Sequence, residues 1–166
     1  MDEAKSAKEL LIRPRTSGDL AQAAAALVAV HEEDGYPVEG VGRPEAWLSP
    51  PGLMAAWVAE SSGLIVGHVA VSGNGGQTAT LERLFVHPVA RGRRAAERLI
   101  LTAEGFVSAR QASLKLEVLS KDRAAIRLYR RMGWKEVGRH VHRLASGESY
   151  SALSFEAPGR RAGESA

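Results

Sequence analysis

The residues between Leu84 and Ala96 have the types and spacing that most directly suggest chemistry. An apolar run ends near Pro88, which lacks a backbone donor and so interrupts a strand ladder. After a short turn, Gly92 and two alanines begin a helical pattern that also contains arginines. A helix start presents unpaired N–H groups and a partial positive charge, and arginines add charge-assisted hydrogen bonds. The segment therefore predicts a diphosphate site, although on charge alone a solvated basic helix end is the better interpretation.

The spacing favours the diphosphate site, because two segments resemble motifs of the GNAT family of acyl-CoA-dependent N-acetyltransferases. The family's cofactor loop has Gln or Arg, two variable residues, Gly, one variable residue, then Gly or Ala. Residues 91–96 match this pattern, with Arg94 in the place of the usual glycine. The family's later helix commonly reads Asn-x-x-Ala-x-x-Leu-Tyr-x-x-x-Gly-Phe, and Asp122–Trp134 matches it with Asp for Asn and Trp for Phe. The resemblance covers roughly residues 55–156.

This resemblance implies an α/β fold with a mixed, mostly antiparallel central sheet flanked by helices. It also implies an N-acetyltransferase that uses acetyl-CoA as co-substrate and transfers the acetyl group to a primary amine. The amine, of a small molecule or of a protein or peptide, would attack directly in a ternary complex. Nothing in the sequence identifies this acceptor.

By resemblance, Tyr129 donates a proton to the leaving thiolate of coenzyme A. A phenol with a pKa near ~10 can protonate a thiolate whose conjugate acid is near ~8.5 when the two are held together. The structural alternative is a core tyrosine on a stripe with Ala125 and Met132. The strand at Leu84, Phe85 and Val86 is implied to offer its backbone amides to the pantetheine arm and to the thioester carbonyl. The remaining implied cofactor contacts are Arg91, Gly92, Arg93, Arg94, Ala95, Ala96, Asp122 and Ala125.

The general base is harder to assign from sequence. Glu82 lies on the same strand and, if the strand is regular, on the face shared with Leu84 and Val86. An ordinary surface ion pair with Arg83 is the alternative for this glutamate. Other candidate bases are His68, Glu32, Glu33 and a water chain.

The acceptor is expected to bind where the first helix leads into the variable segment. Glu32, Glu33 and Tyr36 are the candidate contacts, since acidic side chains would favour a cationic amine. Acids at a helix end are also commonly just solvated. His140 and His142 alternate on an expected strand and are further candidates for this pocket, whereas two histidines alone make a poor metal site.

Two rival functions have weaker support. A non-catalytic acetyl-CoA sensor or interaction module would keep the loop at 91–96 but would not need Tyr129. A nucleic-acid-binding protein would use the arginine-rich helices, yet no recognition motif is present and aromatic residues make up only 5% of the chain. The Gly-Lys-Ser/Thr of a nucleoside-triphosphatase loop is also absent.

The elements that must position these residues follow from periodicity and turn residues. Strands are expected at 10–15, 57–60, 64–72, 78–87, 114–119, 134–139 and 150–156. Helices are expected at about 20–33, 92–110 and 122–132. Residues 34–52 are rich in Gly and Pro and read as an irregular lid over the acceptor.

Length and composition are those of one globular domain, predicted at 9–157, with flexible tails at 1–8 and 158–166. The 166 residues are 45% apolar and 25% charged, with a net charge of only +3. The chain has no cysteine, so disulfides and thiolate metal sites are excluded. We expect no metal, a cytoplasmic location, no membrane or nucleic-acid partner, and a possible homodimer through exposed strand edges.

Overall fold

The computed structural model describes residues 9–37 and 40–159, so the tail predictions lie largely outside it. In this part of the chain, seven strands form one sheet in the order β1-β2-β3-β4-β5-β7-β6. The strands are β1 (Leu11–Pro14), β2 (Leu53–Ser61), β3 (Leu64–Gly73), β4 (Thr78–Val86), β5 (Ser113–Leu119), β6 (Lys135–Arg143) and β7 (Ser149–Glu156). The helices are α2 (Leu20–Asp34), α3 (Pro44–Trp47), α4 (Ala95–Ser108) and α5 (Arg123–Arg131), with short 3-10 turns at η1 (Ser17–Asp19) and η2 (Pro88–Ala90).

The sheet is mixed, because β4 and β5 run parallel whereas the other neighbouring strands are antiparallel. A parallel pair needs a crossover connection, which α4 supplies between these two strands. This architecture confirms the α/β class and the mostly antiparallel sheet expected from the sequence.

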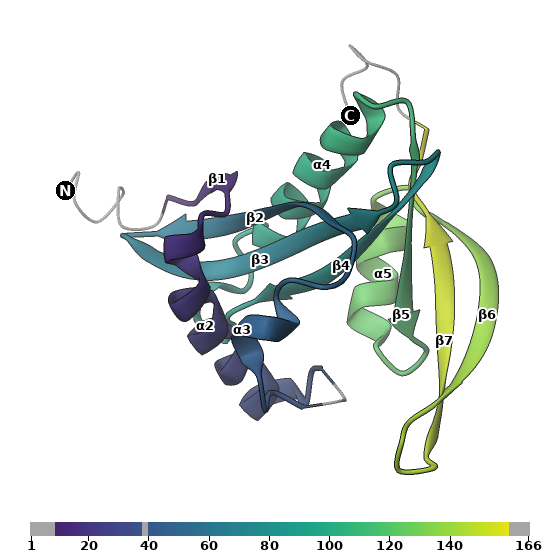
Figure 1. The fold of residues 1–166 in the computed structure, drawn as a ribbon, viewed down its shortest axis with the longest axis horizontal. Helices are drawn as coiled ribbons and strands as arrows, with labels where there is room; N and C mark the ends of the chain where they lie inside the picture. The colour runs from purple at the N-terminus through teal and green to yellow at the C-terminus, as the bar shows by residue number, and fades with distance from the viewer. Residues whose placement is uncertain (1–8, 38–39, 160–166) are drawn as a thin grey trace.

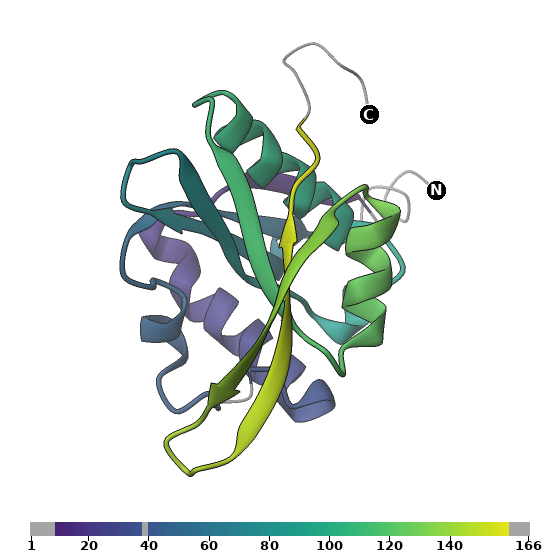
Figure 2. The same cartoon turned by 90° about the vertical axis from the view of Figure 1, so that its right-hand side faces the viewer.

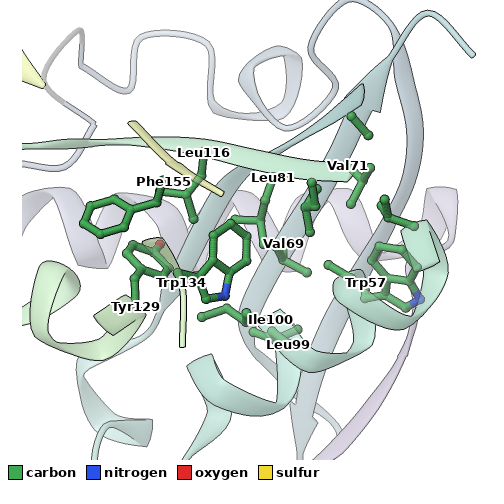
Figure 3. Close-up of a cluster of buried hydrophobic side chains, with 14 of the residues drawn as sticks. Trp57, Val69, Val71, Leu81, Leu99, Ile100, Leu116, Tyr129, Trp134 and Phe155 are labelled. Carbon is green, nitrogen blue, oxygen red and sulfur yellow. The ribbon is translucent and has the colours of Figure 1, made fainter. Parts of the chain in front are cut away.

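Helices cover the two faces of the sheet unequally (Figures 1 and 2). On the face that we call the α4 face, α4 and α5 pack on a large apolar cluster, part of which is drawn in Figure 3. On the opposite face, called the α2 face, α2 and α3 pack on a smaller cluster over β2, β3 and β4. Fully buried side chains such as Leu27, Leu99 and Phe155 anchor the two layers, and burying each contributes about 1.5–3 kcal/mol.

Most expected elements are present, and the differences have local causes. The helix predicted from Gly92 begins at Ala95, because Gly92 and Arg94 have φ angles of 80° and 60°, which a right-handed helix excludes. The stretch expected to be irregular contains α3. Pro44 suits the first turn of that helix, and Trp47 packs at its end against Tyr36, with ring centroids 5.8 Å apart.

The feature that shapes the centre of the sheet is the separation of β4 from β5. Their ladder begins at Thr78, opposite Ser113, and ends at Thr80, opposite Lys115. Beyond this point β4 pairs with β3 and β5 pairs with β7, and the two strands diverge in Figure 1. We call this opening the β4–β5 gap. It leaves the β5-facing edge of residues 81–86 outside any strand ladder in the described structure.

Candidate active site

A bulge in β4, beside the β4–β5 gap, reverses which face of the sheet the following side chains point to. Arg83 has a φ of +56°, and the pairing register with β3 shifts at this level, from Ala70 opposite Glu82 to His68 opposite Phe85. Leu81 therefore packs into the α4-face cluster before the bulge, and Leu84 and Val86 pack there after it. An inserted residue of this kind re-aims the side chains that follow.

The bulge corrects the expected placement of Glu82. A regular strand would put Glu82 on the same face as Leu84 and Val86. Because Arg83 interrupts the alternation, Glu82 instead lies on the α2 face, where Phe85 joins the α2 cluster. Its carboxylate accepts a hydrogen bond from the Ser72 hydroxyl and lies 3.5 Å from Nη1 of Arg83.

The predicted diphosphate loop has the geometry of an anion site. Arg94 is the N-cap residue of α4, and no side-chain hydrogen bond caps this end of the helix. Its first amides therefore carry the positive end of the helix dipole without a hydrogen bond from the N-cap side chain. A Cβ built on Gly92 would meet nothing within 4 Å, so the backbone there is open to a ligand.

The three arginines of the loop differ in the contacts they make with the rest of the chain. Arg91 forms an ion pair with Asp34 at the end of α2, and its Nη2 also lies 3.3 Å from the Val86 carbonyl oxygen. Arg93 donates to the Ser61 hydroxyl at 3.2 Å. Arg94 is exposed. The loop thus has one arginine paired with the end of α2 and a second, exposed arginine beside the start of α4.

Arg94 adopts the left-handed backbone conformation with a φ of 60°. This conformation explains why glycine is usual at this place in the resembling motif, since a Cβ in the left-handed region costs roughly 1–2 kcal/mol per residue.

Tyr129 lies on the α4 face, 6% exposed, among aromatic rings. Its ring centroid is 5.7 Å from that of Trp134 and 6.0 Å from that of Phe155, and Figure 3 shows its hydroxyl pointing away from the backbone of α5. Burial raises the pKa of Tyr129 well above its usual range, and the nearby Asp122 carboxylate adds to this effect. The hydroxyl is therefore protonated at ordinary pH, as a proton donor must be.

Asp122 and Ala125 form the N-terminal cap of α5. The Asp122 side chain accepts a hydrogen bond from the Ala125 amide at 3.1 Å. The replacement of the usual asparagine by aspartate therefore preserves the cap, because both side chains offer an oxygen to the third residue of the helix. This cap sets where α5 begins and hence where Tyr129 lies, two turns later.

Two carboxylates flank the β4–β5 gap on the α2 face. Glu82 follows the last paired residue of β4 by two positions, and Glu117 follows the last paired residue of β5 by two positions. Since strand side chains alternate, and Leu114 and Leu116 pack on the α4 face, Glu117 shares the face of Glu82. Sequence reasoning missed Glu117, because a charged residue alternating with core leucines is ordinary on a half-exposed strand.

Glu117 also gives the two histidines of β6 a partner that the sequence did not predict. Nε2 of His142 lies 3.0 Å and Nε2 of His140 3.7 Å from the oxygens of Glu117, and His140 is also 2.8 Å from the Ser154 hydroxyl. These side chains converge across β7, where small residues stand between β5 and β6. They form a polar surface on the α2 face, and neither α2 nor α3 covers it.

The other residues expected to contact the acceptor lie at the end of α2 and beyond it. Glu32 and Glu33 are exposed on the last turn of α2, and Tyr36 packs against Trp47 beyond it. No contact in the described structure joins Glu32 or Glu33 to the gap. Their role in acceptor binding stays a prediction.

A buried polar network connects the bulge to α3, and sequence reasoning found only part of it. His68 is completely buried. Its Nδ1 lies 2.8 Å from the Arg83 carbonyl oxygen and its Nε2 lies 2.9 Å from Nη1 of Arg15. Because a carbonyl only accepts and a guanidinium only donates, Nδ1 carries the proton and Nε2 accepts.

Both nitrogens of His68 are thus engaged, which excludes the ring as the general base in this arrangement. Burial lowers the pKa of His68 to about 4, the positive charges of Arg15 and Arg83 add to this effect, and the hydrogen bond to the Arg83 carbonyl partly opposes it. The imidazole therefore stays neutral at physiological pH. Sequence reasoning named His68 but could not foresee its partners, which come from distant strands.

The same network holds the end of α3. Arg15 donates to the Leu48 carbonyl at 2.7 Å and to the Ser49 hydroxyl at 2.9 Å. Arg83 donates to the Trp47 carbonyl at 2.9 Å, and its guanidinium lies 4.5 Å from the centre of the Trp47 ring. Arginine is suited to this, because it binds carbonyls and stacks on an aromatic face at once.

Within residues 9–37 and 40–159, no group of three His, Asp or Glu side chains is arranged to hold a metal ion. Across the same described residues, none of the helices combines the length and apolarity needed to span a membrane.

Comparisons with known proteins agree with this geometry. The family model for the acetyltransferase (GNAT) family matches residues 21–134. No curated protein sequence matches the chain at a significant level.

Solved structures share the fold at low sequence identity. The ribosomal-protein-S18-alanine N-acetyltransferase from Escherichia coli superposes with a TM-score of 0.74 at 20% identity, covering 95% of this chain and 99% of its own. The ribosomal-protein-alanine N-acetyltransferase from Brucella melitensis has a TM-score of 0.72 at 23% identity, with coverage of 88% and 98%. The yncA protein of Salmonella typhimurium, solved with its cofactor acetyl-CoA, has a TM-score of 0.70 at 16% identity, with coverage of 93% and 96%.

The split sheet, the start of α4 and the buried tyrosine are the structural features of the candidate site. With the family model covering more than half of its length, the chain belongs to the GNAT acetyltransferase family.

The strained backbone at Arg94 generates a prediction about stability. Arg94→Gly should raise the free energy of unfolding by up to about 1 kcal/mol, because glycine accepts a positive φ without steric cost. The measurement is urea denaturation of the variant and the parent. Arg93→Gly is the matched control, since Arg93 is not among the residues with positive φ, and it should lower stability. Equal loss in both variants would show that residue 94 is not strained.

Proposed function

We propose that this chain is an acetyl-CoA-dependent N-acetyltransferase that transfers the acetyl group to a primary amine by direct attack in a ternary complex. The single observation that carries the proposal is the β4–β5 gap, whose two faces bear different chemistry. A buried phenol, Tyr129, stands on the α4 face, and carboxylates stand on the α2 face. A thioester lying in the gap would meet a proton donor on one side and a base on the other.

The donor side of this proposal rests on the loop and the strand edge. The diphosphate of acetyl-CoA fits the uncapped amides at the start of α4, beside Gly92 and Arg94. From there the pantetheine arm would enter the gap along the free edge of Leu84–Val86, whose amides lie outside the β5 ladder. Amides aimed at a developing oxyanion are worth about 3–4 kcal/mol each in comparable sites.

The acceptor side rests on the α2 face. An amine approaching between the segment that follows α2 and the β6–β7 strands would reach the thioester carbon from the side of Glu82 and Glu117. Two carboxylates there favour a cationic amine, whether of a small molecule or of a protein or peptide. One of them would remove the proton that the amine must lose before or during attack.

The non-catalytic sensor is the alternative function. It would need the diphosphate loop and the strand edge alone. The protonated, buried Tyr129 on the α4 face favours an enzyme over a sensor, since binding by itself does not need a proton donor.

The first test concerns donor binding and transfer. Millimolar acetyl-CoA should raise the melting temperature, because a ligand that binds only the folded state stabilises it by mass action. Desulfo-coenzyme A should compete, whereas DNA should not. A panel of amines, scored by free-thiol release from acetyl-CoA, then identifies the acceptor. No melting shift would contradict the assignment, and binding without release from any amine would favour the sensor.

The two carboxylates generate a second prediction, on the general base. Both oxygens of Glu82 are near donors, the Ser72 hydroxyl and Arg83, whereas Glu117 lies against imidazoles that can pass a proton on to solvent. We therefore expect Glu117→Gln to lower turnover by about 10²-fold or more, the range of general base catalysis, and Glu82→Gln to lower it less. The reverse order would assign the base to Glu82, and two near-normal variants would assign it to water.

A third prediction concerns Tyr129. Tyr129→Phe keeps the ring that packs against Trp134 and Phe155 and removes only the hydroxyl. If that hydroxyl protonates the leaving thiolate, the loss belongs in kcat, about 10²–10⁴-fold, with acetyl-CoA affinity nearly unchanged. The measurement is turnover with the identified amine, alongside a binding titration. Near-normal turnover, with chemistry shown to limit the rate, would remove Tyr129 from the mechanism.

A further inference from the structure

The peptide bond between Arg83 and Leu84 has its orientation set by a side chain from another strand. Its carbonyl oxygen accepts a hydrogen bond from Nδ1–H of His68 at 2.8 Å. The C=O and N–H of a trans peptide point in opposite directions. The amide of Leu84 is therefore directed away from His68, and His68 stands on β3, across β4 from the gap.

We propose that His68 is a positioning residue for acetyl transfer, which orients the Leu84 amide as a hydrogen-bond donor to the thioester carbonyl. The inference rests on the proposed function, because it assumes that acetyl-CoA lies in the β4–β5 gap. Arg83 is in the left-handed region, which a residue with a Cβ adopts only at a steric cost, so contacts of the folded protein must hold this backbone in place. The hydrogen bond from His68 is one such contact, and it fixes the orientation of the peptide between Arg83 and Leu84.

Arg15 gives His68 the tautomer that this role requires. A neutral imidazole has one donor and one acceptor nitrogen. Nη1 of Arg15, 2.9 Å from Nε2, can only donate, so it excludes a proton from Nε2 and assigns it to Nδ1. Phe85 stacks on the ring with centroids 5.3 Å apart and interplanar angle 12°, which limits rotation. Nδ1–H of His68 is therefore a hydrogen-bond donor with a fixed position and direction next to the Arg83 carbonyl.

Three substitutions of His68 separate positioning from packing. His68→Asn places its amide nitrogen where Nδ1 stands, so it keeps the donor to Arg83 and loses the contact with Arg15. His68→Gln reaches toward Arg15 and loses the donor to Arg83, and His68→Leu loses both. All three remove the stacked imidazole and should lose stability to a similar degree.

Turnover should instead follow the Arg83 hydrogen bond. We expect His68→Asn to remain within about 3-fold of the parent in kcat, and His68→Gln and His68→Leu to fall by about 10–100-fold, less than the loss of a whole oxyanion donor. The KM for acetyl-CoA should change little. Gln22→Leu is the control, because it removes another side-chain contact to β3, the 3.2 Å bond from the Ile65 amide. Equal kcat values for the Asn, Gln and Leu variants would overturn the proposal.

A spectroscopic measurement tests the same point without an acceptor. In the parent, the Leu84 amide proton should shift further downfield with acetyl-CoA than with coenzyme A, which has no thioester carbonyl. That difference should persist in His68→Asn and disappear in His68→Gln. Nitrogen shifts of the parent imidazole should show a protonated Nδ1, and a protonated Nε2 would overturn the proposal even if every variant failed to fold. Failure of acetyl-CoA to bind at all would instead contradict the proposed function.

Discussion

The site depends on one constraint, namely that β4 cannot pair with β5 beyond Thr80. Buried backbone groups must find partners, so a strand that leaves its neighbour inside a sheet presents donors and acceptors that call for substitutes. At the bulge, a buried imidazole supplies one of them, for the Arg83 carbonyl. On the edge that follows, the Arg91 guanidinium reaches the Val86 carbonyl at 3.3 Å. A split in a sheet thus costs stability, because backbone groups lose their ladder partners. It also leaves those donors and acceptors at the regular spacing of a strand.

The split also divides the chemistry between two surfaces of different character. On the α4 face, Tyr129 lies among aromatic rings in a dry environment, where burial favours its neutral form. On the α2 face, Glu117, His140 and His142 lie at a more exposed surface. The two sides of the opening therefore differ in their exposure to solvent.

Periodicity and motif spacing were sufficient to predict most of the elements and the sheet class, but not α3 or the residue at which α4 begins. They could not predict the bulge at Arg83, because no sequence pattern marks a non-glycine residue in the left-handed region. For this reason the predicted face of Glu82 was wrong. Periodicity and motif spacing also could not predict contacts between distant strands. Glu117 with His140 and His142 joins β5 to β6 across an intervening strand, and the partners of His68 come from β1 and β4. Local patterns carry little information on such long-range pairs.

The ion pair between Arg91 and Asp34 means that any anion binding to this arginine would compete with a carboxylate of the chain itself. A phosphate that takes this guanidinium has to displace a carboxylate that is already there, so the net electrostatic gain is smaller than the charge of the loop suggests. Asp34 is the last residue of α2. An anion bound to Arg91 would therefore release one contact between the end of α2 and the loop that precedes α4.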